Sequence, residues 1–304
     1  METSWTADEI PVSVRVHDTL RSAIRCFVPR LTRRWKAGQA TERKDVCRFG
    51  LKFVLARFFL YRQPMPQPTA TRGNVAALIP CYFEEKHIRD VSSRTTAALD
   101  TVLVVDDGST DRTSEEAKTS GCQVIRHEKN AGKGAAIKTG LKALLAKEDV
   151  EFILILDGDG QHLPEEIPAF LVAANATGAP MIVGNRMGDV RDMPFVRKCT
   201  NRYMSWTISR VIGQRVPDTQ CGFRMFHRSL AELFLTTESA GFDFETEMLA
   251  IAAQKGCAIA DAKVSTVYGD EVSKIHPVRD TLKFFKLLNR LKKARGKRAG
   301  AGLS

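Results

Sequence analysis

The chain has 304 residues, of which 43% are hydrophobic, and a formal net charge of +11. This length and composition allow an ordinary globular core. No apolar run approaches the ~18–20 residues that a membrane-spanning helix needs, so an integral membrane protein with its own spanning helices is not expected. The polar, acidic N-terminus lacks the basic-then-apolar order of a signal peptide. The seven cysteines form no CxxC pair, which favours a reduced, cytosolic chain over a disulfide scaffold.

The positive charge is concentrated in the two flanks of the chain. Lys and Arg outnumber Asp and Glu in residues 1–73 and 279–304, whereas residues 74–278 are mildly acidic. Such flanks suit an anionic membrane surface or nucleic acid, and a solvated charge run without a partner is the alternative. The flanks contain no recognised RNA or DNA motif, and the acidic middle would repel a phosphate backbone. We therefore expect a membrane surface and no nucleic acid as partner.

In chain order, the first predicted element is a basic helical extension over residues 1–62. Its segment 48–62 interleaves aromatic and basic residues, which is typical of the membrane interface; packing on the main domain is the alternative. Three prolines among polar residues predict a linker over 63–73. At the other end, residues 279–304 are expected to form a basic helix and tail.

Between these flanks, apolar strands alternate with helices of about 10–15 residues. The expected strands lie at 75–80, 101–109, 122–128, 151–160 and 180–186. In one of the intervening helices, Thr113 and Glu116 have the spacing of a capping box. This alternation predicts an α/β fold with right-handed crossovers, a mostly parallel central sheet and helices on both faces.

Polar clusters follow four of the predicted strands, at residues 80–84, 106–109, 157–161 and 184–186. Ligands of parallel sheets bind beyond the carboxyl ends of the strands, where these clusters are expected to converge. Residues 74–278 contain neither G-x-G-x-x-G after the first strand nor a P-loop, which argues against dinucleotide oxidoreductases and P-loop ATPases.

The sequence DGDGQH after the strand at 151–160 predicts a site for Mg²⁺ or Mn²⁺. In extended chain Asp157, Asp159 and Gln161 would share one face. Three hard oxygen donors with open positions suit a cation that also binds a substrate's phosphates. A simple Asp-Gly turn is the alternative. An EF-hand is excluded, because His162 and Pro168 stand where its loop needs Gly and Glu.

Two further motifs have both a binding and a structural interpretation. DDGSTD at 106–111 offers a carboxylate to a ribose or nucleobase, or forms a turn with a helix cap. NAGKGAAI at 130–137 places glycines at a helix start, which favours an anion there or close helix–sheet packing. Near a metal, Arg186, Arg197 and Lys274 would hold anionic oxygens, with solvated surface as the alternative.

The motifs together resemble a known family. LIPCYFEE, VVDDGSTD, NAGKGAAIKTG, DGDGQHLP, GNRM, DTQCGFRMF, FDFETEML and YGDEVSKIHPVRDT occur in the order found in family 2 glycosyltransferases. The resemblance covers about residues 74–285 and is strongest to the bacterial-type dolichol-phosphate mannosyltransferase and polyprenyl-phosphate glycosyltransferase branch. It implies a GT-A (nucleotide-diphospho-sugar transferase) fold over 74–278, a nucleotide-sugar donor, and Mg²⁺ or Mn²⁺ on the D-x-D motif.

The resemblance also implies roles for individual residues. The donor nucleotide-sugar would contact Pro80, Tyr82, Glu84, Val105, Asp107, Gly158 and Arg186. The metal would be held by Asp157, Asp159 and Gln161. The phosphate of a lipid acceptor would contact Arg197, Asn201 and Lys274. The chain departs from the family pattern at Phe83, where Asn is usual, at Asn185, where Ser is usual, and at Thr266 and Val267, which precede the YG loop without a basic residue.

The expected activity is metal-dependent, inverting transfer of a hexose from a donor of the GDP-mannose or UDP-glucose type to undecaprenyl or dolichyl phosphate. The enzyme would act as a peripheral protein on the cytosolic membrane face. A lipid phosphate is already ionised and needs no strong general base. A hydroxyl acceptor on a soluble glycan or protein is the alternative; Asp218 is then the candidate base, unless it only caps its loop. A nucleic-acid-binding module is a weaker third hypothesis.

Overall fold

The computed structural model describes residues 69–265, except 189, 192, 238, 240 and 242. Their centre is a seven-stranded sheet with the strand order β3-β2-β1-β4-β6-β5-β7. The strands are β1 Val75–Cys81, β2 Thr101–Asp106, β3 Gln123–Arg126, β4 Phe152–Ile155, β5 Met181–Asn185, β6 Arg224–His227 and β7 Ile259–Lys263. Strand β6 pairs antiparallel with β4 and β5, and the other pairs are parallel.

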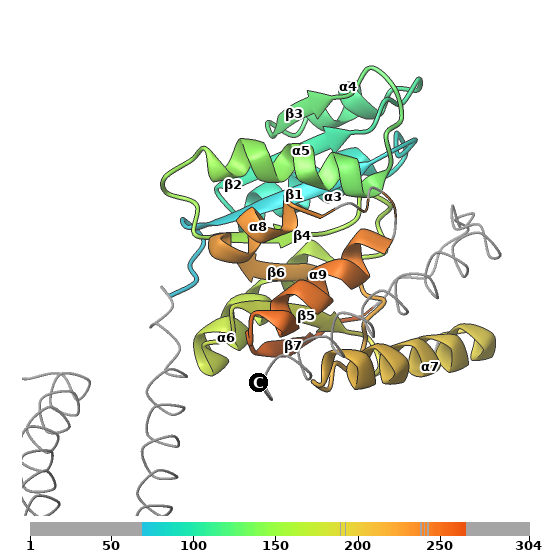
Figure 1. Ribbon diagram of the computed structural model, residues 1–304. Coiled ribbons are helices and arrows are strands. Elements are labelled where there is room, and N and C mark those ends of the chain that lie inside the picture. Colours follow the sequence, from blue (N-terminus) through green and yellow to red (C-terminus); the bar gives the residue numbers. More distant parts are fainter. Residues whose placement is uncertain are drawn as a thin grey trace, which may run out of the picture. The chain divides into compact units, whose positions relative to one another are not determined.

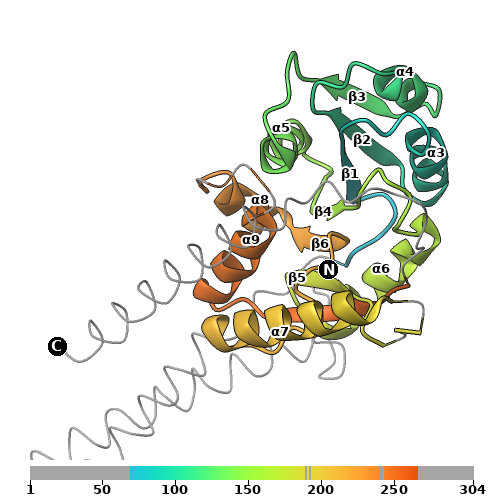
Figure 2. The ribbon, with the colours of Figure 1, turned by 90° about the vertical axis from the view of Figure 1, so that its right-hand side faces the viewer.

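Helices cover both faces of this sheet (Figures 1 and 2). Their bounds are α3 Ile88–Ala98, α4 Thr113–Lys118, α5 Lys133–Leu145, η1 Pro164–Glu166, α6 Ile167–Thr177, α7 Phe195–Ile212, α8 Arg228–Phe234 and α9 Asp243–Gln254. Figure 2 shows α5, α8 and α9 on one face and α3, α4 and α6 on the other. Helix α7 lies near the β5–β7 end of the sheet and packs against α9.

The central strands are buried because they are apolar on both faces. Every residue of β1 and β4 is buried, as expected of strands with helices above and below them. Burying one such Val, Leu or Ile side chain stabilises the fold by about 1.5–3 kcal/mol. The core therefore fixes β1, β2 and β4 side by side, with their carboxyl ends at one edge of the sheet.

The predicted α/β fold with a mostly parallel sheet is confirmed. The antiparallel strand β6 and the edge strand β7 were not predicted, because their sequences, RMFH and IADAK, lack the continuous apolar run that marks strands such as β4. The capping box proposed for Thr113 and Glu116 is wrong. Thr113 Oγ1 accepts a hydrogen bond from the Glu84 amide at 2.9 Å and donates to Asp111 Oδ1 at 2.6 Å, so tertiary contacts use the hydroxyl.

Several predicted features lie outside the described residues, namely the extension 1–62, the linker up to residue 68, the tail 279–304 and Lys274. Within the part that is described, no helix combines the length and the apolar character needed to cross a bilayer.

Candidate active site at the carboxyl ends of the parallel strands

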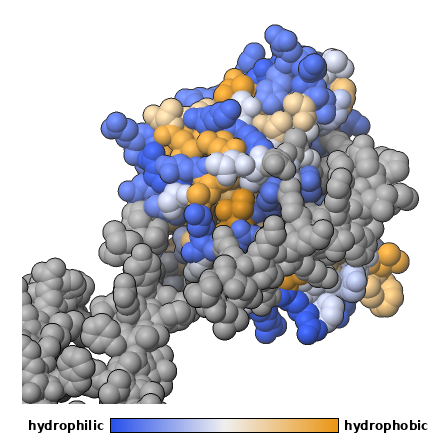
Figure 3. Space-filling model, in the orientation of Figure 1, coloured by the Kyte–Doolittle hydropathy of each residue, from blue (hydrophilic) through white to orange (hydrophobic). Residues whose placement is uncertain are grey.

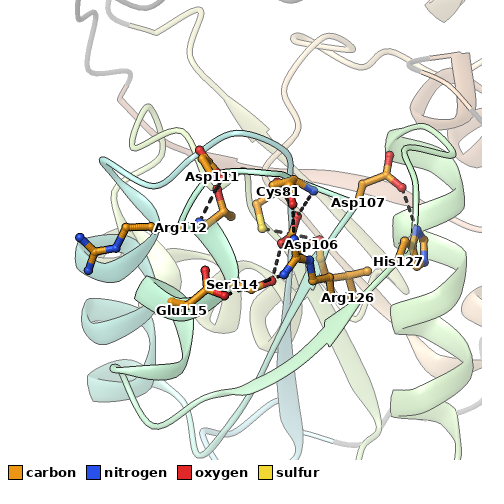
Figure 4. A network of polar contacts seen from close by, with 12 residues as sticks. Cys81, Asp106, Asp107, Asp111, Arg112, Ser114, Glu115, Arg126 and His127 are labelled. Carbon is orange, nitrogen blue, oxygen red and sulfur yellow. Dashed lines mark hydrogen bonds and ion pairs between the residues drawn. The ribbon is translucent and has the colours of Figure 1, made fainter.

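Asp106, the last residue of β2, organises the loop that follows it (Figure 4). Its buried carboxylate accepts hydrogen bonds from the Ser109 amide at 2.9 Å, the Ser109 hydroxyl at 2.5 Å and the Ser114 hydroxyl. Arg126 Nε lies 3.8 Å from the same carboxylate. Charge-assisted bonds of this kind are strong, so Asp106 holds the loop in shape.

Asp107 closes the N-terminus of α5, a contact between distant parts of the sequence. Its carboxylate accepts hydrogen bonds from the amides of Gly132 at 2.7 Å and Ala131 at 3.0 Å. His127 Nδ1 lies 2.7 Å from Asp107 Oδ1 (Figure 4). The other ring nitrogen lies 2.9 Å from Thr139 Oγ1. The anion expected at this glycine-rich helix start is thus supplied by the chain itself. The predicted contact of Asp107 with a donor stays a prediction.

The loop after β1 is fastened to the loop after β2. The Phe83 amide donates to Ser109 Oγ at 2.9 Å, and Tyr82 and Glu84 are half-buried beside this contact. Phe83 has a φ of 55°, in the left-handed region that bulky residues rarely adopt. Of the other predicted donor residues on these two strands, Pro80 is buried and Val105 has no exposed surface. Tyr82 and Glu84 therefore have the accessible side chains among the predicted donor residues of this region, and their contact with a donor stays a prediction.

The D-x-D segment is a turn, and the extended geometry expected for it is wrong. Strand β4 ends at Ile155, and Gly160 has a φ of 80°. The Gln161 amide donates to Asp159 Oδ1 at 3.0 Å, which closes a local Asx turn. Alternation of side chains stops where the strand stops, so a shared strand face does not bring Asp157, Asp159 and Gln161 together.

His162, for which the sequence predicts no role, supports this turn. The Asp157 amide donates to His162 Nδ1 at 3.1 Å, and the imidazole stacks on Phe223 with 5.2 Å between ring centroids. Burial lowers the pKa of His162 to about 4. The ring is therefore neutral at pH 7, as its role as a hydrogen-bond acceptor requires.

Lys133 joins the first aspartate of the motif to a glutamate far along the chain. Its Nζ lies 2.6 Å from Asp157 Oδ1 and 2.9 Å from Glu245 Oε1. Burial by itself would raise the pKa of Asp157 and lower that of Lys133. The opposite charges reverse both effects, so that the pKa of Asp157 is lowered and that of Lys133 is raised. Both groups are thus charged at neutral pH.

Two glycines allow the polypeptide to pack closely around Asp157. A Cβ on Gly222 would lie 2.7 Å from Asp157 Oδ2, so the glycine of DTQCGFR is explained by contact with the D-x-D carboxylate. A Cβ on Gly158 would lie 3.0 Å from the Cys81 Cβ and 3.2 Å from Ile88 Cδ1. Core packing is therefore the reason that the structure gives for glycine at 158.

Arg186 at the end of β5 forms a bidentate ion pair with Asp218. Arg186 Nε lies 2.7 Å from Asp218 Oδ2 and Nη2 lies 3.0 Å from Oδ1. The Gln220 amide also donates to Asp218 Oδ1 at 3.1 Å, and the Asp218 side chain is fully buried. These contacts favour the structural interpretation of Asp218 over its use as a general base. Arg186 is also close enough to help lower the pKa of Asp157.

The loop that carries Asp218 is held by α7 and by a buried arginine. Arg224 donates to the carbonyls of Cys221 at 2.7 Å and Thr219 at 2.9 Å, and also to that of Glu245. The Thr219 amide donates to Ser205 Oγ on α7 at 2.9 Å. A helix places residues four apart on one face.

That face of α7 also carries two of the predicted acceptor residues. Asn201, one turn before Ser205, is buried, and Arg197, two turns before it, is half-buried. The structure therefore connects these two residues to the Asp218 loop through one helix. The third predicted acceptor residue, Lys274, lies outside the described residues.

The opposite side of α7 exposes large apolar side chains among cations. Phe195 is 78% exposed and Trp206 is 56% exposed, and Val196 and Tyr203 are exposed as well. The guanidinium of Arg210 lies 4.9 Å from the centroid of the Trp206 ring. Hydrophobic surface is visible over the end of α7 at the lower right of Figure 3.

The aspartates of the D-x-D turn fit a cation that is shared with a substrate. Among residues 69–265, as far as they are described, no group of three or more His, Cys, Asp or Glu could hold a metal by itself. Mg²⁺ commonly binds through one or two carboxylates and the phosphates of a substrate. The carboxylates of Asp157 and Asp159, with the side-chain carboxamide oxygen of Gln161, match that incomplete kind of donor set.

Known proteins are similar to this chain in sequence and in fold. The profile of glycosyl transferase family 2 matches residues 76–234, more than half of the chain. A UDP-N-acetylglucosamine--dolichyl-phosphate N-acetylglucosaminyltransferase of Methanococcus voltae is 29% identical over 214 residues, which cover 63% of this chain and 84% of that protein. A polyprenol monophosphomannose synthase of Mycolicibacterium smegmatis is 28% identical over 201 residues, covering 62% and 75%.

A solved structure shows the same fold. Glucosyl-3-phosphoglycerate synthase of Mycobacterium tuberculosis, in complex with Mn²⁺, uridine diphosphate and phosphoglyceric acid, has a TM-score of 0.52 and 19% identity. The match covers 68% of this chain and 77% of that one. This likeness shows the GT-A fold. Fold and family profile agree, and the chain belongs to the family 2 glycosyltransferases.

Proposed function

We propose that the enzyme transfers a hexose from a nucleotide-sugar to a polyprenyl phosphate, with inversion at the anomeric carbon. The bond from the anomeric carbon to the donor's β-phosphate oxygen breaks, and a bond to an acceptor phosphate oxygen forms. The nucleoside diphosphate leaves with the electron pair of the broken bond. The two relatives described above, a dolichyl-phosphate N-acetylglucosaminyltransferase and a polyprenol monophosphomannose synthase, support this acceptor class.

Negative charge grows on the leaving diphosphate, and the site must stabilise it. Asp157, Asp159 and Gln161 would hold Mg²⁺ or Mn²⁺, which when bound neutralises part of that charge. Tyr82 and Glu84, in the loop after β1, would position the nucleoside. Arg186 is fixed by Asp218 with its guanidinium near Asp157, where it would stabilise the donor.

The burial of Asp218 and its ion pair with Arg186 are the observation that favours a phosphate acceptor. A hydroxyl acceptor needs a base to remove its proton, whereas a phosphate is already ionised. Asp218, the candidate base, is buried and has both carboxylate oxygens bound to Arg186. Arg197 and Asn201 on α7, together with Lys274, would instead bind the acceptor phosphate.

The exposed side of α7 supports delivery of this acceptor from a membrane. Aromatic rings with neighbouring cations, such as Trp206 with Arg210, are suited to the interface of an anionic bilayer. The basic flanks 1–73 and 279–304 would add electrostatic attraction to the cytosolic face.

A transfer assay tests this proposal. The full chain is incubated with Mn²⁺ and a panel of UDP- and GDP-sugars labelled in the hexose, and with undecaprenyl phosphate in detergent. Parallel reactions contain soluble glycans or proteins in place of the lipid. We expect label in the lipid fraction with one donor. Label only on a hydroxyl acceptor would refute the phosphate acceptor and would return Asp218 to the role of base.

A further inference from the structure

The buried ammonium of Lys133 lies against the first aspartate of the D-x-D motif. Its Nζ contacts Asp157 Oδ1 at 2.6 Å and Glu245 Oε1 at 2.9 Å. The three side chains come from the start of α5, the turn after β4 and the first turn of α9. Three separate elements thus meet at one positive charge, and this charge has no part in the proposed transfer step.

This charge must affect any cation that binds Asp157. Asp157 Oδ1 is itself buried, so its contact with Lys133 is poorly screened by water. Like charges a few ångströms apart repel strongly in a partly buried site. A divalent cation at Asp157 therefore competes with the Lys133 ammonium for the same carboxylate.

Two groups can relieve that competition. Glu245 is already in contact with Lys133 and can remain its ion-pair partner when a divalent cation binds Asp157. A nucleoside diphosphate would bring further negative charge to the site. The position of Lys133 between two carboxylates, rather than on one, makes the exchange geometrically possible.

We propose that Lys133 is a positioning residue, the internal counter-ion of Asp157, and that it makes cation binding at Asp157 depend on the donor's diphosphate. This inference rests on the proposed function, in which Asp157 holds the cation. Without a nucleotide, Lys133 weakens cation binding. With a nucleotide, the added negative charge offsets Lys133, and cation and donor bind together. Binding linkage then requires that the cation strengthen donor binding by the same factor.

The test is a titration of the full-length protein with Mn²⁺ alone, followed by electron paramagnetic resonance of the free ion. We expect Lys133→Met to bind Mn²⁺ at least about tenfold more tightly than the wild type, because the competing charge is gone. Loss of a residue with only a packing role would weaken binding or leave it unchanged. Lys133→Arg keeps the charge and is the matched control, with affinity near that of the wild type. Circular dichroism verifies that each variant is folded.

Glu245→Gln gives the opposite sign. Without the second carboxylate the ammonium stays on Asp157, and Mn²⁺ binding should weaken about threefold to tenfold. In the Lys133→Met background the same change should have no effect. If Glu245→Gln weakens binding equally in both backgrounds, Glu245 is a direct ligand and its role as partner of Lys133 is refuted.

Uridine and guanosine diphosphate complete the test. Added nucleotide should tighten Mn²⁺ binding to the wild type and have a smaller effect on Lys133→Met. Asp157→Asn separates this inference from the proposed function. If Asp157→Asn binds Mn²⁺ as the wild type does, the metal assignment itself fails. If Asp157→Asn loses Mn²⁺ but Lys133→Met gains no affinity, only the counter-ion role fails. Failure of both wild type and Lys133→Met to bind Mn²⁺ also refutes that role.

Discussion

The guanidinium of Arg186 binds both carboxylate oxygens of Asp218, at 2.7 and 3.0 Å, and the Arg186 amide adds a third contact at 3.3 Å. The Asp218 side chain is fully buried in this pair. The contact ties the end of β5 to the loop before β6 and holds the Arg186 guanidinium within electrostatic reach of Asp157. Loss of this ion pair should therefore affect both the stability of the fold and the rate of the proposed transfer.

Asp218→Ala should destabilise the fold by about 3 kcal/mol, because the largely buried Arg186 guanidinium would lose its bidentate carboxylate partner. Urea unfolding measures this loss. Asp218→Asn should reduce transfer at least tenfold, by about 1.4 kcal/mol or more, without changing the shape of the pH–rate profile. In an Arg186→Met background it should cost little more, since the two residues act as one unit. Loss of the acidic limb of the profile in Asp218→Asn would instead identify a general base.

Asp159→Ala should abolish metal-dependent transfer, because it removes one of the two carboxylates that are proposed to hold the cation. The fold should stay intact, because Asp159 is half-exposed and its Oδ1 accepts a hydrogen bond within a local turn. Chelation of the wild type with EDTA should give the same loss, reversed by Mn²⁺ or Mg²⁺. Val172→Ser, on the exposed surface of α6, is the control that should keep full activity. Unchanged turnover of Asp159→Ala would contradict the metal assignment.

His162 predicts a pH-dependent stability. Burial lowers its pKa from the usual 6.5 to about 4, so the unfolded chain binds a proton between these values and the folded chain does not. Stability should therefore fall as the pH drops from about 6.5 to about 4, by on the order of 3 kcal/mol.

His162→Gln keeps an acceptor for the Asp157 amide but cannot titrate in this range. Its stability should accordingly change less than that of the wild type over the same interval. Chemical unfolding in EDTA at several pH values between 4 and 7.5 compares the two proteins. Parallel curves for both would show that His162 does not set this dependence.

Phe83 should be replaceable with a gain in stability, because its φ of 55° is unfavourable for a bulky side chain. We expect Phe83→Gly to stabilise the fold by about 0.5–1 kcal/mol and Phe83→Asn by less. Phe83→Ala loses the same ring but keeps most of the backbone strain, so it should not stabilise. Thermal unfolding ranks the three variants, and equal effects of Gly and Ala would contradict the argument.

Trp206→Ser should weaken binding to vesicles that contain anionic lipid, because it removes the largest exposed ring of α7. A fewfold loss is expected, since one exposed ring is one of several attractions. Sedimentation with vesicles measures the loss of membrane binding, and binding of a nucleoside diphosphate should stay unchanged. Val172→Ser also removes an exposed apolar residue, but from α6, and is the matched control. An equal loss in both variants would refute a specific role of α7.

The sequence by itself determined the α/β class, the first five strands and the family. Apolar strands such as 75–80 and the short D-x-D motif depend on neighbours in the chain, so they can be recognised locally. It also indicated that polar residues gather at the carboxyl ends of the strands, because parallel strands end at one edge of a sheet.

Only the tertiary structure decided what each carboxylate does. Asp106, Asp107 and Asp218 are all buried in contacts within the protein. Their partners come from other elements, and spacing along one chain does not encode such contacts. The same holds for Lys133 and Glu245, which meet at Asp157 only because α5 and α9 pack on the same face of the sheet.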